Sequence, residues 1–193
     1  MVKQIVLGSS SPYRRSLLSK ILPQFETCAP EIDETPRPGE EPASLAARLA
    51  EAKARAVAAH YPDALIIASD QVAVVNGRVQ GKPGDHARAV AQLKACSGNQ
   101  VTFLTALCLY DGNSNQMDTL VEPFQVYFRE LSPQEIERYL TRETPYDCAG
   151  SFKSEGLGIA LFERMEGDDP NTLIGLPLIK LAQLLRNRGI QIP

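Results

Sequence analysis

The sequence predicts an α/β protein in which helices flank a mixed β-sheet, and three observations support this fold class. The 193 residues are 44% hydrophobic and 22% charged, a composition typical of globular proteins with a sizeable core. Short apolar runs that indicate strands alternate with segments of helical spacing. Hairpin signals such as Asn76-Gly77 interrupt this alternation and indicate antiparallel strands beside parallel ones. We therefore expect a single domain over residues 1–193.

The chain is predicted to begin with a strand, a serine-rich turn and a helix. Residues 4–7 form a short buried strand that ends at Gly8 and three serines. Ser11 can cap the following helix, which has a proline in its first position. A second strand is expected at 25–28. Residues 29–42 carry four prolines and five acidic residues, a composition typical of a rigid, exposed loop.

The middle of the chain combines a helix with a buried strand. An alanine-rich segment predicts a helix from Ala43 to about Ala59, with Ser44 as its cap. Residues 65–68 predict a buried strand that delivers residues 69–71 (Ser-Asp-Gln) at its C-terminal end. A hairpin, a helix capped by Asp85 and two longer strands are then expected at 72–80, 85–96, 101–110 and 120–129.

The last third of the chain predicts two helices and one more strand. Residues 132–135 (Ser-Pro-Gln-Glu) form a capping box that starts a helix ending at Thr141. Residues 144–158 are expected to be a loop and 159–162 a strand. A final helix is predicted over 176–188, ending at a glycine.

Charge and residue counts argue against several classes of protein. With 20 Lys and Arg against 23 Asp and Glu, the net charge is −3, so neither nucleic acid nor an anionic membrane is an expected partner. Two histidines are too few for a multi-histidine zinc site, and no G-x-S-x-G motif of a serine hydrolase is present. The four cysteines form no C-x-x-C pair, which favours reduced thiols over disulfides.

The apolar stretches are short. The longest uncharged one, Val101 to Tyr110, cannot span a bilayer as a helix. The aliphatic run before Gly8 is shorter than the apolar core of a signal peptide. We therefore expect a cytoplasmic protein.

Three segments have residue types that bind phosphate or metal. Ser9, Ser11 and Arg14 follow a strand and open a helix, where backbone amides and a guanidinium can bind an anion; the alternative is a capped helix with solvated arginines. Asp70 at a strand end can hold Mg²⁺ or orient a water, or can simply form a turn. The acidic loop around Glu34 can add a carboxylate, or can be solvated surface.

Two lysines and a glycine-rich loop are further candidates. Lys53, on the alanine-rich helix, and Lys82, in a Gly-Lys-Pro-Gly turn, can neutralise phosphate oxygens, although exposed helix lysines are common. Glu155, in the loop 148–156, can accept hydrogen bonds from a ligand edge, or can belong to an ordinary loop.

Seven motifs in this order resemble the Maf family of nucleoside triphosphate pyrophosphatases over essentially the whole chain. They are SSSPYRR, EIDETP, AEAKA, SDQ, GKP, CAGSFKSEG and GLPL. The resemblance implies a mixed sheet flanked by helices, in two lobes around a cleft, similar to inosine triphosphate pyrophosphatase. It implies hydrolysis between the α and β phosphates to a nucleoside monophosphate and pyrophosphate with Mg²⁺ or Mn²⁺, and it suggests a homodimer.

The resemblance also implies a role for each matching residue. Asp70 would be the proton-accepting carboxylate, and Glu34 would share the metal with it. Whether Asp70 acts mainly as base or as metal ligand stays open at this stage. The triphosphate would be held by Ser9, Arg14, Lys53 and Lys82.

Within the family, SDQ and SFKSEG resemble the 7-methyl-GTP pyrophosphatases more than the dTTP/UTP pyrophosphatases. The positions implied to set this choice are Tyr13, Gln71 and Glu155, and the first group usually has Trp where this chain has Tyr13. N7-methylation makes guanine cationic, which suits an aromatic face, while a carboxylate can accept the guanine N–H groups. The alternatives are a dTTP/UTP pyrophosphatase and a nucleotide-binding regulator of septum formation.

Overall fold

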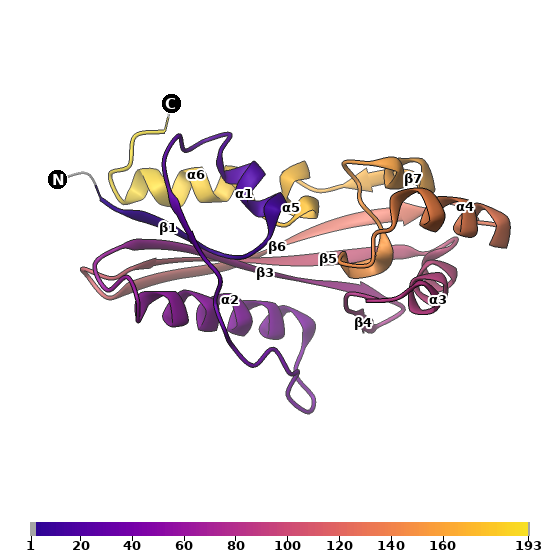
Figure 1. Cartoon of the computed structure of the whole chain (residues 1–193), viewed down its shortest axis with the longest axis horizontal. Coiled ribbons are helices and arrows are strands. Elements are labelled where there is room, and N and C mark those ends of the chain that lie inside the picture. Colours follow the sequence, from indigo (N-terminus) through magenta and orange to yellow (C-terminus); the bar gives the residue numbers. More distant parts are fainter. Residues whose placement is uncertain (1–2, 193) are drawn as a thin grey trace. The chain divides into compact units, whose positions relative to one another are not determined.

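A computed structural model describes residues 3–192, and within them the strands form one seven-stranded sheet (Figure 1). The strands are β1 (Ile5–Gly8), β2 (Glu26–Cys28), β3 (Leu65–Val75), β4 (Arg78–Gln80), β5 (Gln100–Asp111), β6 (Gln116–Phe128) and β7 (Phe162–Glu166). Their order is β2-β1-β3-β5-β6-β7, with β4 paired to β3. β1 is parallel to β2 and β3, whereas the β3–β4 and β6–β7 pairs are antiparallel. The predicted mixed sheet is confirmed.

Helices flank this sheet, as predicted. They are α1 (Pro12–Leu18), α2 (Pro42–Ala58), α3 (His86–Cys96), α4 (Pro133–Glu143), α5 (Pro170–Ile174) and α6 (Leu178–Asn187), with short 3₁₀ helices η1 (Ala149–Ser151) and η2 (Leu157–Leu161). Three predicted caps are confirmed, because the side chains of Ser11, Asp85 and Ser132 accept bonds from the first turns of α1, α3 and α4. None of the helices within 3–192 is long and apolar enough to cross a membrane.

The chain folds into two compact units made of interleaved segments. The first unit contains the residues up to Asp70, Thr105–Glu122 and the residues from Asp169 onward; the second contains Gln71–Leu104 and Pro123–Asp168. Strands β3, β5 and β6 contribute residues to both units. Neither unit is one continuous stretch of sequence, so each depends on contacts between distant segments.

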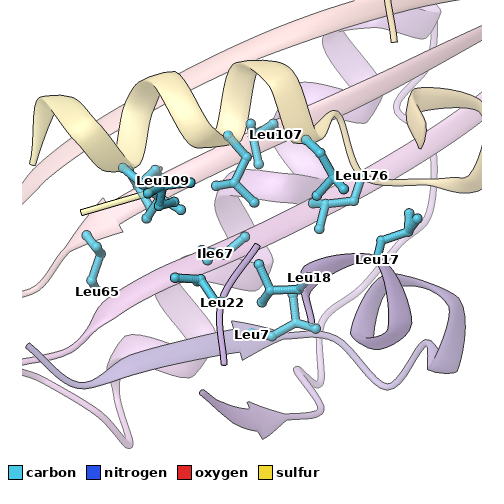
Figure 2. Packing of buried hydrophobic residues seen from close by; sticks show 13 residues of the cluster. Leu7, Leu17, Leu18, Leu22, Leu65, Ile67, Leu107, Leu109 and Leu176 are labelled. Carbon is cyan, nitrogen blue, oxygen red and sulfur yellow. The ribbon is translucent and has the colours of Figure 1, made fainter. Parts of the chain in front are cut away.

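In the first unit, aliphatic side chains pack between the sheet and the helices α1 and α6. Leu65 and Ile67 alternate with their neighbours along β3, so both lie on the same face of the sheet. Figure 2 shows them beside Leu7 of β1 and Leu109 of β5, with Leu176 before α6. These side chains are fully buried, and they fix the strands that lead to the polar residues described below.

Helix α2 lies against the opposite face of β1 and β3 (Figure 1). Its close approach depends on Gly8, because a Cβ there would lie 3.2 Å from Val57 Cγ2. The two faces of β3 therefore meet different helices. Within the first unit, odd positions of β3 such as Ile67 face α1 and α6, and even positions such as Asp70 face α2.

The second unit has an aromatic core. Phe128, Phe152 and Phe162 pack edge to face with one another at centroid distances of 4.9–5.3 Å, and Phe103 adds a further contact to Phe152. This arrangement is the favoured geometry for aromatic pairs. It holds the loop before Phe152, which carries η1, against β5 and β6.

Several predicted boundaries were wrong. Ser44 does not cap α2, which begins at Pro42 because proline is already set for a first helical position, with Glu41 before it. β3 does not end at Ala68: it runs on to Val75, because its later residues pair with β4.

Other corrections concern the second half of the chain. β6 begins at Gln116, four residues before the predicted start, and α6 begins at Leu178. The strand predicted at 159–162 is mostly η2, and β7 starts only at Phe162. The short helix α5 was not predicted, although Asp169 caps it and Pro170 opens it.

We predict that Leu181→Ala lowers the free energy of unfolding by about 2–5 kcal/mol, because it leaves a cavity beneath α6. Leu181 is fully buried in the core of the first unit. The matched control is Ile179→Ala on the same helix, where the side chain is 57% exposed and the expected change is within about 0.5 kcal/mol. Urea denaturation of both variants measures the difference, and equal losses would contradict this core assignment.

Candidate functional site

Polar residues follow the carboxyl end of the parallel pair β1–β3. The register pairs Gly8 with Ala68, so Ser9 and Ser69 come next along the two strands, and Asp70 follows Ser69. Ser9, Ser69 and Asp70 are all buried, with Asp70 8% exposed. Ligands of α/β proteins bind at this edge of a sheet, so the position agrees with a binding site.

The turn between β1 and α1 is ordered by its own serines. The Ser11 amide donates to Ser9 Oγ at 3.1 Å, and the Arg14 amide donates to Ser11 Oγ at 3.3 Å. These bonds fix the start of α1 and place the Arg14 side chain on its first turn.

A carbonyl from the end of the chain orients Arg14. Arg14 Nε donates to the Gly175 carbonyl at 2.8 Å, and Ser69 Oγ donates to the same oxygen at 2.9 Å. Gly175 has φ +131°, a conformation that favours glycine. Asp169 steadies this segment by accepting bonds from the amides of Asn171 and Ile179. One carbonyl thus links the first turn, β3 and the α5–α6 segment.

Lys53 of α2 joins two carboxylates. Its Nζ lies 2.5 Å from Asp70 Oδ1 and 2.7 Å from Glu34 Oε1. The Lys53 and Asp70 side chains are only 10% and 11% exposed, whereas that of Glu34 is 61% exposed. Since Asp70 lies at an even position of β3, it faces α2 and meets Lys53 there, while Ser69 faces the other side.

Arg14 lies within the electrostatic field of the same carboxylates. Burial lowers the pKa of the Arg14 guanidinium, and the negative charges of Asp70 and Glu34 act in the opposite direction. Arginine keeps its charge in proteins, so Arg14 adds a second cation to the group. The first unit therefore brings together Ser9, Arg14, Glu34, Lys53 and Asp70, with the charges of two cations and two carboxylates.

The two carboxylates have the chemistry of a magnesium or manganese site. Glu34 and Asp70 each direct one oxygen at a single cation, the Lys53 ammonium, so their oxygens converge. Hard oxygen donors suit Mg²⁺, which often takes only one or two carboxylates and completes its ligands with water and phosphate. Among residues 3–192, no three His, Cys, Asp or Glu side chains gather closely enough to make a metal site by themselves.

The remaining predicted site residues belong to other parts of the fold. Tyr13 is on α1 in the first unit, whereas Gln71, Lys82 and Glu155 belong to the second. Gln71 follows Asp70 on β3, and strand alternation places the two side chains on opposite faces. The participation of these four residues in a common site stays a prediction.

In the second unit, Gln92 of α3 connects the segments that carry Lys82 and Glu155. Its Nε2 donates to the Gly81 carbonyl at 3.0 Å, and its Oε1 accepts from Ser151 Oγ at 2.5 Å. Gly81 precedes Lys82, and Ser151 lies in the CAGSFKSEG motif. One amide side chain thus holds both motifs.

The segment around Glu155 is also fixed on both sides by α4. The Lys153 amide donates to the Tyr139 hydroxyl at 3.0 Å, and the Leu157 amide donates to Glu143 Oε2 at 2.8 Å. Burial is the main cause that raises the pKa of Tyr139, so its hydroxyl stays protonated and neutral. The sequence did not point to the roles of Gly175, Gln92, Tyr139 and Glu143. Gly175 does lie in the GLPL motif, but the motif does not show what its carbonyl binds.

We predict that Lys53 and Asp70 are energetically coupled. A double-mutant cycle with Lys53→Met and Asp70→Asn should give a coupling energy of about 1–3 kcal/mol, because both side chains are buried and in direct contact. The parallel cycle with Glu34→Gln should give less than about 1 kcal/mol, since the Glu34 side chain is 61% exposed. Chemical denaturation of the single and double variants measures both, and equal coupling would contradict the burial argument.

Comparisons with known proteins agree with this arrangement. The family of Maf-like proteins matches residues 4–188. A protein of Nitrosococcus oceani named 7-methyl-GTP pyrophosphatase is 58% identical over 185 residues, covering 96% of this chain and 93% of that protein. A protein of Colwellia psychrerythraea with the same name is 53% identical over 191 residues, covering 99% of this chain and 96% of that protein. The chain therefore belongs to the Maf family.

Proposed function

We propose that this protein hydrolyses nucleoside triphosphates between the α and β phosphates, releasing a nucleoside monophosphate and pyrophosphate, and that it prefers 7-methyl-GTP. The observation that carries the proposal is the cluster of Arg14, Lys53, Asp70 and Glu34 beside the point where the pairing of β1 with β3 ends. Two similar proteins bear the name 7-methyl-GTP pyrophosphatase, which supports the reaction class. The expected cytoplasmic location and homodimer belong to the same proposal.

The cations of the cluster are suited to a triphosphate. Arg14 is fixed through Nε by the Gly175 carbonyl, which leaves the two terminal nitrogens of its guanidinium for phosphate oxygens. Lys53 would exchange a carboxylate for a phosphate oxygen, because its contacts are made by one ammonium group at the end of an unbranched side chain. Lys82 of the second unit would neutralise the departing pyrophosphate.

Asp70 is suited to accept the proton of the attacking water. The water oxygen forms a bond to the α phosphorus while the bond from that phosphorus to the bridging oxygen breaks. The electron pair of the broken bond leaves with pyrophosphate, and the water proton passes to a carboxylate oxygen of Asp70. Lys53 contacts Oδ1, so the other oxygen of Asp70 is available for this role.

Glu34 and Asp70 would hold Mg²⁺ or Mn²⁺, which when bound neutralises charge on the phosphates and polarises the reacting phosphoryl group. Water and phosphate oxygens would complete the ligand set. Asp70 would therefore use its carboxylate for both metal and proton.

Tyr13 and Glu155 support the preference for 7-methyl-GTP. The N7-methylated base is cationic and stacks on an aromatic face such as that of Tyr13. The carboxylate of Glu155 can accept hydrogen bonds from the N–H groups that guanine presents and that thymine and uracil present differently. Gln71 is the third residue proposed to act on this choice.

A substrate panel tests the proposed reaction. We expect pyrophosphate release from 7-methyl-GTP with Mg²⁺ or Mn²⁺, and its loss when a chelator removes the metal. The kcat/KM for 7-methyl-GTP should exceed that for GTP by about 2- to 30-fold, the range of one cation–π contact. Faster release from dTTP or UTP would replace the proposed substrate with the alternative one, and no release from any triphosphate would overturn the enzymatic proposal.

Asp70→Asn separates catalysis from binding. The variant should release pyrophosphate about 10²- to 10⁴-fold more slowly, because it loses the proton acceptor. Binding of the α,β-methylene analogue of the nucleotide, measured by calorimetry with Mn²⁺ present, should fall far less than turnover. The controls are the wild-type protein and Asp63→Asn. Asp63 is an exposed residue in the turn before β3, so its carboxylate lies outside the cluster. Unchanged turnover in Asp70→Asn would disprove the mechanism.

A further inference from the structure

The loop that carries Glu34 is tied to helix α2 by an arginine that the sequence analysis did not single out. This loop, residues 29–41, connects β2 to α2. Arg48 Nε donates to Glu40 Oε1 at 2.6 Å and Arg48 Nη2 donates to Glu40 Oε2 at 2.8 Å. Nη2 also donates to the Thr35 carbonyl at 3.1 Å. One guanidinium therefore holds two points of the loop.

The tie is partly shielded and has favourable geometry. The Arg48 and Glu40 side chains are 22% and 9% exposed, and two parallel N–H to oxygen bonds make the pair bidentate. Arg48 lowers the pKa of Glu40 to about 2, so Glu40 stays ionised at any pH at which the enzyme would work. These features distinguish the Arg48–Glu40 pair from ordinary surface ion pairs, which contribute little to stability.

Glu40 and Asp33 extend the order through the loop. Glu40 Oε2 accepts from the Arg37 amide at 3.0 Å, and the Glu40 amide donates to the Arg37 carbonyl at 3.1 Å. Asp33 Oδ1 accepts from the Thr35 amide at 2.9 Å. Glu34 thus lies between Asp33 and Thr35, and both neighbours are fixed.

We propose that Arg48 is a positioning residue that holds Glu34 beside Lys53 and Asp70, so that the two carboxylates can share one divalent cation. Arg48 and Lys53 lie five positions apart on α2, and the loop meets the helix at both: Thr35 at Arg48, and Glu34 at Lys53. Arg48 acts through the loop and does not contact the reacting atoms. The inference rests on the proposed metal role of Glu34.

The Lys53–Glu34 contact cannot replace this tie. The Glu34 side chain is 61% exposed, and an ion pair of that kind adds little to loop order. In the proposed reaction Lys53 turns toward phosphate, which removes its contact with Glu34. The contacts of Arg48 are independent of Lys53, so they keep the loop in place at that stage.

The test compares Arg48→Met with Arg55→Met. Arg55 is a matched control, because it also lies on α2 and pairs with a glutamate, but that partner is Glu51 of the same helix, at 3.3 Å. The Mn²⁺ concentration for half-maximal pyrophosphate release should rise about 10-fold in Arg48→Met, as for other residues that orient metal ligands, while kcat at saturating Mn²⁺ stays within about 2-fold. Arg55→Met should change neither quantity.

Two readouts do not depend on turnover. Electron paramagnetic resonance of Mn²⁺ with the α,β-methylene nucleotide analogue should show the same weakening of metal binding in Arg48→Met. Hydrogen exchange should speed up in peptides covering 30–41 and should be unchanged elsewhere. Glu40→Gln breaks the tie from the loop side and should reproduce these effects, which guards against a folding defect specific to Arg48→Met.

The outcomes separate the two proposals. Identical metal dependence in Arg48→Met, Glu40→Gln and Arg55→Met would overturn the positioning role. A fall in kcat with no change in metal dependence would also overturn it. If the wild-type protein binds Mn²⁺ with the analogue but releases no pyrophosphate, the proposed reaction fails, while the metal-binding and exchange measurements still decide the role of Arg48.

Discussion

The Lys53 ammonium, held between the carboxylates of Asp70 and Glu34, is the interaction on which the site depends. It connects three separate pieces of the chain: helix α2, strand β3 and the acidic loop before α2. A lysine with a side chain only 10% exposed requires opposite charge around it, and a carboxylate 11% exposed requires the same in return. Each group therefore supplies the opposite charge that the other needs in its buried position.

The strand register places this interaction just beyond the point where the pairing of β1 with β3 ends. β1 pairs with β3 only as far as Ala68, so Ser69 and Asp70 extend beyond the paired segment. Successive side chains of β3 point to opposite faces of the sheet, so Ser69 contacts the Gly175 carbonyl on one face and Asp70 contacts α2 on the other. Because Arg14 of α1 binds the same carbonyl as Ser69, β3 is linked to an oriented guanidinium through Ser69 and to the Lys53 ammonium of α2 through Asp70.

Local signals in the sequence were enough for much of the fold. The caps at Ser11, Asp85 and Ser132 involve residues three apart, so neighbouring residues alone determine them. Contacts between distant residues could not be predicted in this way. Arg14 and Gly175 are 161 positions apart, and a glycine in a sequence does not show which side chain its carbonyl will bind.

The same distinction applies to the site: the sequence indicated several of its residues but not the contacts between them. Residue types and a family resemblance pointed to Asp70, Lys53 and Glu34, but an alanine-rich helix pattern could not tell a buried lysine from an exposed one. The pairing of Lys53 with both carboxylates follows from tertiary packing. Arg48 was missed for a similar reason, because its partners in the acidic loop are fixed only when that loop folds against the helix.

The dependence of Arg14 on the Gly175 carbonyl has a consequence for biosynthesis. Gly175 follows Arg14 by 161 positions, so the guanidinium is synthesised well before the carbonyl that orients it. The contacts of Arg14 and Ser69 therefore form only after the α5–α6 segment has folded against the first turn and β3. A chain that stops before Gly175 would lack the acceptor that orients Arg14.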